Sequence, residues 1–147
     1  MPRSSVYMVR TALLWLAIGA AIGGLMLINK GLAFWPALWA WRWAHVHTLL
    51  IGWMLQVACG VANWMLPRPK ITGWRGDQRL AWWSYICLNL GVISAVLPGS
   101  ATLLGLGSRL NGFYLLSGLS YALAMLTWVL AIWPRLIPSL REQKPSA

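Results

Sequence analysis

The sequence predicts an all-α integral membrane protein, a four-helix bundle whose N- and C-termini are both cytoplasmic. Of its 147 residues, 59% are hydrophobic and only 10% are charged, whereas soluble domains have about 45–50% apolar and about 25% charged residues. The apolar residues fall into four runs, each close to the roughly 20 residues that a bilayer-spanning helix needs. The length leaves room for one transmembrane domain, residues 1–147.

Turn-forming residues separate the four runs and predict where each helix ends. The first run stops at a polar Asn-Lys-Gly step, and the other three meet prolines at Pro67, Pro98 and Pro134. Proline lacks a backbone N–H and restricts the residue before it, so these positions predict helix ends. We expect helices at about residues 7–27, 38–66, 80–97 and 113–133.

The distribution of basic residues predicts the orientation. Nine Lys and Arg residues lie at the ends or in the loop that the four helices would place on one side, and three lie on the other. The positive-inside rule assigns the side with nine to the cytoplasm. Tryptophans gather before the second helix and around its far end, as expected for two interfacial belts. We therefore expect a multi-pass protein of the inner (plasma) membrane.

Acidic residues are nearly absent, which excludes several classes of function. Asp77 and Glu142 are the only two acids, and both lie outside the predicted helices. Proton pumps and ion-coupled transporters normally depend on intramembrane carboxylates, and paired-carboxylate hydrolysis is excluded for the same reason. The net charge of +10 does not indicate nucleic acid, because basic residues at helix ends set orientation and contact anionic lipid in the bilayer.

The first helix carries small residues at helical spacing, Gly19 with Gly23 and Ala20 with Gly24. Such spacing lets two helix backbones approach closely. Helix packing is the favoured interpretation, and close approach to a flat cofactor is the alternative.

Two histidines, His45 and His47, are the strongest candidates for chemistry. Both lie near the outer end of the second helix. An ionisable residue within a membrane span is a functional hypothesis by default, and imidazole is a common ligand of metals and of haem. The alternative is that both are interfacial histidines, hydrogen-bonded to headgroups or to loop carbonyls.

The two histidines should face different sides of the helix, because two residues correspond to about 200° of rotation. Helical steps from His45 reach small and polar residues, including Gly52, Gln56 and Asn63, so His45 should point into the bundle. A gap opposite Gly52 would admit a flat macrocycle. Steps from His47 reach apolar residues, so His47 should face lipid or a neighbouring subunit.

The run from Arg42 to Trp53, RWAHVHTLLIGW, resembles the second helix of the haem-copper oxidase catalytic subunit (subunit I) family. It is most similar to the cbb3-type and nitric-oxide-reductase-like branch and to short subunit-I-like membrane proteins. In that family an Arg-x-x-His supplies an axial ligand of the low-spin haem b. The resemblance implies that role for His45, with Arg42 three residues before it and Gly52 seven residues after. A His-Thr pair is also typical there, and His47 with Thr48 matches it instead.

The resemblance implies haem b as the cofactor, with Arg42 pairing a propionate and Trp43 or Trp39 covering the haem edge. The family's copper ligands, high-spin haem ligands and second low-spin ligand have no counterpart in this chain, so oxygen reduction by this chain alone is not implied. The second ligand would come from a symmetry mate, from a methionine such as Met125, or from His47 of a neighbour. Otherwise the iron would be five-coordinate, with one position free to bind a gas.

Three functions follow from these observations, and they leave open whether the protein is an enzyme. The first is a small b-type cytochrome, for electron transfer with a quinone or another redox partner or for gas binding. The second is a cofactor-free accessory subunit of a respiratory oxidase-like complex. The third is a protein that handles copper or haem through His45 and His47. Because a four-helix unit has little interior for a haem, we expect a homo-oligomer or a larger respiratory complex.

Overall fold

The computed structural model describes residues 1–66, 77–105, 110 and 112–136, and every regular element in them is helical. Within these residues, four stretches are long and apolar enough to span a membrane, which confirms the predicted number of helices. Three of them extend beyond both predicted ends. In chain order the elements are α1 (Arg3–Leu32), η1 (Pro36–Trp41), α2 (Arg42–His47), η2 (Thr48–Leu55), α3 (Gln56–Met65), α4 (Gln78–Leu103) and α5 (Gly112–Leu136).

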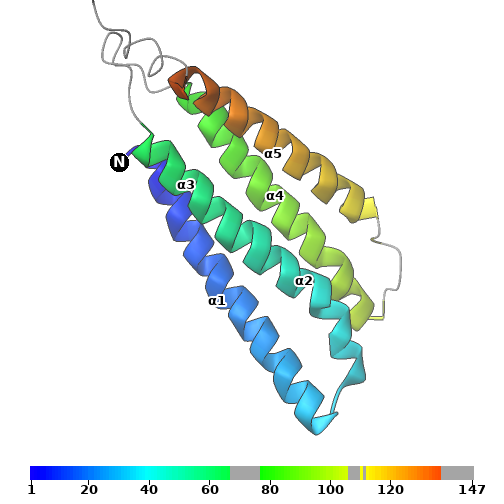
Figure 1. Cartoon of the computed structure of the whole chain (residues 1–147). Helices are drawn as coiled ribbons and strands as arrows, with labels where there is room; N and C mark the ends of the chain where they lie inside the picture. Colours follow the sequence, from blue (N-terminus) through cyan, green and yellow to red (C-terminus); the bar gives the residue numbers. More distant parts are fainter. Residues whose placement is uncertain (67–76, 106–109, 111, 137–147) are drawn as a thin grey trace, which may run out of the picture.

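The second stretch is one continuous rod, hereafter the second span, that begins with a turn of 3₁₀ helix and contains a π-helical segment, η2. Figure 1 shows the second span between α1 and α4, with α5 against the far side of α4. Neighbours in the chain run antiparallel, so the N-terminus and the end of α5 lie at the same end of the bundle. The two ends of the four-helix unit therefore share one side, as the sequence predicts.

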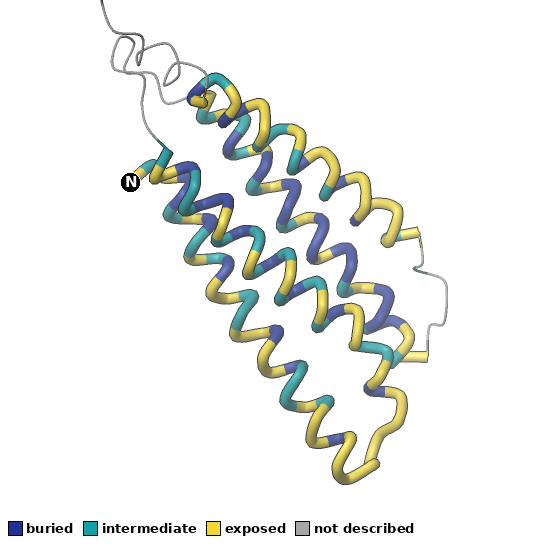
Figure 2. The backbone as a smooth tube through the Cα atoms, in the orientation of Figure 1, coloured by how far each residue is buried: buried dark blue, intermediate teal, exposed yellow. Residues whose placement is uncertain are grey.

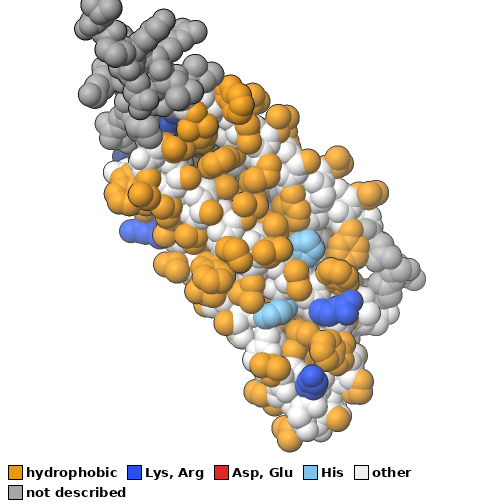
Figure 3. All heavy atoms as spheres, in the orientation of Figure 1, with side chains coloured by type: hydrophobic (Ala, Val, Ile, Leu, Met, Phe, Trp, Pro, Cys, Tyr) orange, Lys and Arg blue, Asp and Glu red, His pale blue; other side chains and the backbone are white. Residues whose placement is uncertain are grey.

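The helix α4 is the most buried of the four, and Figure 2 shows the buried stripe along its length. Leu88 of α4 and Ala124 of α5 are fully buried, and Ile51 and Leu55 of the second span pack against them. The outward faces carry large apolar side chains, such as Leu115 with 75% of its surface exposed (Figure 3). So extensive an apolar surface suits lipid rather than water.

Three side-chain hydrogen bonds join the parallel helices α1 and α4. Ser4 donates to Gln78 at 3.1 Å, Thr11 and Tyr85 share a bond of 3.0 Å, and the indole of Trp15 donates to Asn89 at 2.8 Å. Each pair is separated by 74 residues, so the two helices keep one register along this face. Hydrogen bonds of this kind stabilise helix association in lipid, where apolar contact alone gives little preference between protein and lipid neighbours.

A buried arginine joins α5 to the end of α3. Arg135, only 3% exposed, donates to the backbone and side-chain oxygens of Asn63 at 2.9 and 3.1 Å and to the carbonyl of Leu66. The last carbonyls of a helix have no partner within it and carry partial negative charge. Arg135 therefore caps α3, and Asn63 in turn donates to Ser4 and Ser5 of α1.

The expectation that helices end at Pro98 and Pro134 is wrong. The helix α4 continues through Pro98 to Leu103, and α5 continues to Leu136. Pro98 and Gly99 are buried, and a Cβ added at Gly99 would lie 2.8 Å from the carbonyl oxygen of Ala40. Tertiary packing against η1 thus holds α4 helical past the proline, as neighbouring elements often do in membrane proteins.

Candidate functional site

The side chain of His45 lies between the second span and α1. Its Nδ1 is 2.8 Å from the carbonyl oxygen of Gly19. A Cβ added at Gly23 would lie 2.5 Å from Cε1 of the same ring. Only a residue without a side chain at Gly23 leaves room for the imidazole at this depth. The small residues of α1 thus allow the second span to pack closely here, and His45, the candidate ligand, fills the space that they leave.

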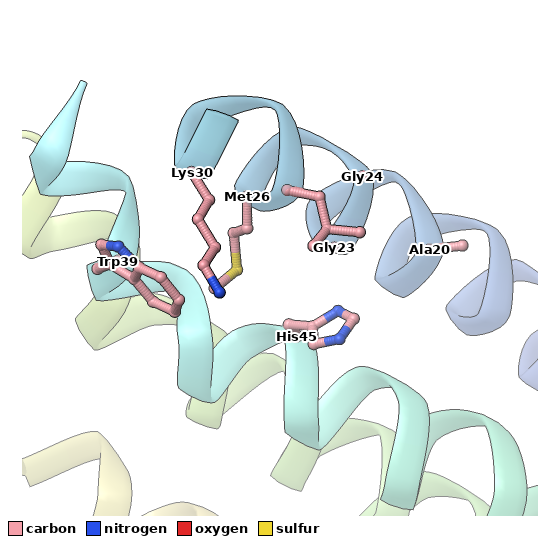
Figure 4. A pocket seen from close by; sticks show the side chains of 8 residues that line it. Ala20, Gly23, Gly24, Met26, Lys30, Trp39 and His45 are labelled. Atoms are coloured by element: carbon pink, nitrogen blue, oxygen red, sulfur yellow. The ribbon is translucent and has the colours of Figure 1, made fainter. Parts of the chain in front are cut away.

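A cavity of about 500 Å³ opens beside His45, between α1 and the N-terminal half of the second span. That volume lies within the usual range for small-molecule sites, about 300–1,000 Å³. Figure 4 shows its lining, with Met26 and Lys30 entering from α1 and Trp39 and His45 from the second span. A Cβ at Gly24 would meet nothing within 4 Å, so this glycine faces open space. The lining residues are Ala20, Gly23, Gly24, Met26, Leu27, Lys30, Trp39 and His45.

The hydrogen bond to Gly19 determines which nitrogen of His45 is available. A carbonyl oxygen only accepts, so Nδ1 is the donor in this bond, and in the neutral imidazole Nε2 then has the lone pair. Histidines that ligate metals almost always donate their other ring N–H to a carbonyl or carboxylate in this way, which fixes tautomer and ring orientation. The chemistry and the glycine-lined space around His45 therefore fit a planar metal-containing cofactor bound through Nε2.

His47 lies in a different environment. Its Nδ1 is 3.2 Å from the hydroxyl of Tyr121, and the two rings stack with centroids 5.7 Å apart and an interplanar angle of 21°. It lines a second pocket of about 250 Å³ with Trp43 and Tyr114. The His47 ring itself thus contacts Tyr121 of α5 and not lipid alone, so the expectation for this residue is wrong in that respect. Met54 and Met65, apolar residues on the same predicted face, are 53% and 69% exposed and face outward as expected.

The π-helical segment η2 (Thr48–Leu55) begins directly after His47. In a π-helix the hydrogen bonds run from i to i+5, so each turn is wider than the 3.6 residues of an α-helix. His47, Ile51 and Leu55, at intervals of four residues, each contact α4 or α5. Such π segments occur frequently at functional sites.

The space opposite Gly52 is filled, which contradicts the expected gap for a macrocycle. A Cβ added at Gly52 would lie 2.8 Å from the indole of Trp15. The same spacing of four places Thr48, Gln56 and Gly60 on this α1-facing side. The cavity lies nearer the N-terminal end of the second span, at Trp39 and His45, and not at Gly52.

The other predicted site residues are not grouped around His45. The guanidinium of Arg42 lies 5.0 Å above the ring of Trp43, beside the His47 pocket. Met125 packs against the Cys87–Leu88–Ala124 core. Neither Arg42, Trp43 nor Met125 lines the cavity at His45, whereas Trp39 does.

Sequence reasoning missed Met26 and Lys30. The spacing of seven residues between Gly23 and Lys30 places both on one helical face, and this is the signal that could have identified Lys30. Both histidines reach the surface on the face shown in Figure 3. Within residues 1–66, 77–105, 110 and 112–136, no three His, Cys, Asp or Glu side chains come together to hold a metal ion.

No family model, curated protein or solved structure matches this chain. The likeness of the Arg42–Trp53 run to the haem-copper oxidase subunit therefore stays a prediction from those residues.

Proposed function

We propose that this protein is a small membrane b-type cytochrome that holds haem b through Nε2 of His45. One observation carries the proposal. Nδ1 of His45 donates to the Gly19 carbonyl at 2.8 Å, and the ring borders a cavity of about 500 Å³ whose lining includes Ala20 and Gly24 of α1. When bound, haem b supplies one-electron transfer, or gas binding if an axial position is free.

Lys30 is the residue that would pair with a haem propionate. It lines the cavity from the C-terminal end of α1, and Figure 4 shows its side chain extending toward the space between Trp39 and His45. Trp39 covers the adjacent edge. Arg42, which the family resemblance suggested for the propionate, is engaged with Trp43 instead. A cation at the rim and an apolar interior match an amphiphilic cofactor whose acidic groups face the interface.

The orientation that we propose follows the charge distribution. With both termini in the cytoplasm of a cell with an inner (plasma) membrane, the His45 cavity lies in the outer half of the bilayer. A redox partner of this cytochrome would then act from the outer face or from the lipid. The pocket of Trp43, His47 and Tyr114, of about 250 Å³, is where we place a quinone headgroup, since aromatic rings and an imidazole border it.

A cofactor-free accessory subunit is the second candidate, and one observation favours it. The bond from His45 to Gly19 also satisfies a histidine whose only task is to pack α1 against the second span. A single copper ion held by both histidines has less support, because His45 contacts α1 and His47 contacts Tyr121 of α5.

The absorption spectrum of the purified, detergent-solubilised protein tests the proposal. A haem b cytochrome has a Soret band and a sharp α-band on reduction, and iron should accompany it in elemental analysis. A colourless protein free of iron, obtained from cells supplied with haem, would support the accessory-subunit function. Copper without haem would support the third function.

A further inference from the structure

We propose that the thioether of Met26 is the second axial ligand of the haem, so that one chain supplies both ligands. The inference rests on the proposed function, since it concerns the iron that His45 would hold. It differs from the expectation of Met125 and from the expectation that a second copy of the chain supplies the ligand.

The lining of the cavity limits which side chains could be the second ligand of the haem iron. Met26, Lys30 and His45 are the lining residues with a side-chain nitrogen or sulfur that can bind a metal, and the proposed function assigns Lys30 to a haem propionate. The indole of Trp39 only donates. Among the described residues, Met125 is packed in the core and His47 is bonded to Tyr121. The thioether of Met26 is therefore the remaining donor.

The position of Met26 suits this role. It lies on α1, three residues after the Gly23 against which His45 rests, and it is half-buried. Figure 4 shows that Met26 and His45 extend into the space between the two helices from opposite sides. Three rotatable bonds let a methionine adjust the position of its sulfur. His/Met ligation is found in c-type cytochromes, where it raises the reduction potential.

The test compares Met26→Leu with the matched control Met125→Leu in the full chain, each loaded with haem. With Met26 as ligand, Met26→Leu keeps haem on His45, loses the low-spin spectrum and gains carbon monoxide binding in the reduced form at about one per haem. Met125→Leu keeps the spectrum of the unaltered protein. A third variant, Met26→His, restores a low-spin spectrum and has a lower reduction potential than the unaltered protein.

Two results would overturn the inference, and they are distinguishable from failure of the proposed function. A low-spin spectrum and no carbon monoxide binding in Met26→Leu would exclude Met26 as ligand while leaving haem on His45. About one haem per two chains would indicate a haem shared between two copies through His45. A protein that takes up no haem at all would overturn the proposed function, and this inference with it.

Discussion

The imidazole of His45 occupies the position that a side chain at Gly23 would need, with Cε1 only 2.5 Å from the site of a Cβ there. Its Nδ1 reaches past Gly23 to the carbonyl of Gly19, one helical turn earlier. The packing of Gly23 on α1 and the position of the His45 ring on the second span therefore depend on each other. Substitution of either residue should change how the two helices meet at this point.

Gly23→Ala should displace the His45 ring and break its bond to Gly19. We expect haem content to fall several-fold, because losing the hydrogen bond to a ligating histidine typically costs about 10–100-fold in metal affinity. The measurement is haem per chain after purification. Gly118→Ala is the control, since a Cβ there meets nothing within 4 Å. Equal haem content in both variants would contradict the arrangement described.

Lys30→Gln should weaken haem binding more than Arg42→Gln. An exposed ion pair contributes about 1 kcal/mol or less, so the haem dissociation constant should rise about fivefold or less in Lys30→Gln. Titration of haem into the apoprotein at low ionic strength measures both variants. A larger loss in Arg42→Gln would restore the assignment that the family resemblance implies.

Arg135→Met should destabilise the bundle. The substitution leaves the last carbonyls of α3 without the donors that Arg135 supplies, and an unmet buried polar group costs about 1–3 kcal/mol. We expect a loss of about 2–4 kcal/mol in the free energy of unfolding, because Asn63 and Leu66 are both affected. Unfolding in mixed micelles measures it. Arg10→Met, at an exposed position of α1, should change stability little, and an equal loss there would contradict the capping role.

Tyr121→Phe should leave haem content and spectrum unchanged. The substitution removes only the hydroxyl that bonds His47 at 3.2 Å. Interhelical hydrogen bonds in membranes contribute about 0.6 kcal/mol on average, so a loss of that order in unfolding free energy is expected. A changed Soret band in Tyr121→Phe would indicate that His47, and not His45, is the ligand.

Much of the fold was predictable from composition and hydrophobic runs. Four stretches of the required length, an even number of crossings and the direction of His45 toward a neighbouring helix all follow from local pattern. The continuation of α4 past Pro98 was not predictable. It depends on the packing of Gly99 on the carbonyl of Ala40, and these residues are almost sixty positions apart in the sequence. Local sequence signals do not contain such contacts.

The candidate site was predictable only in part. His45 and the glycines of α1 could be identified, but not that they meet, since the pairing of helices is a tertiary property. The contact of His47 with Tyr121 was not predictable, because an apolar helical face suits a neighbouring helix as well as lipid and the local pattern does not distinguish them. Arg42 lies one turn before His45, yet its guanidinium lies over Trp43, and spacing along a helix does not predict the direction of a long side chain.

The most direct test of the central claim is haem content in matched histidine variants of the purified protein. The account predicts that His45→Gly loses haem, that added imidazole restores it, and that His47→Gly retains about the haem of the unaltered chain. Loss of haem in His47→Gly with retention in His45→Gly would contradict the account and assign the ligand to the His47–Thr48 pair.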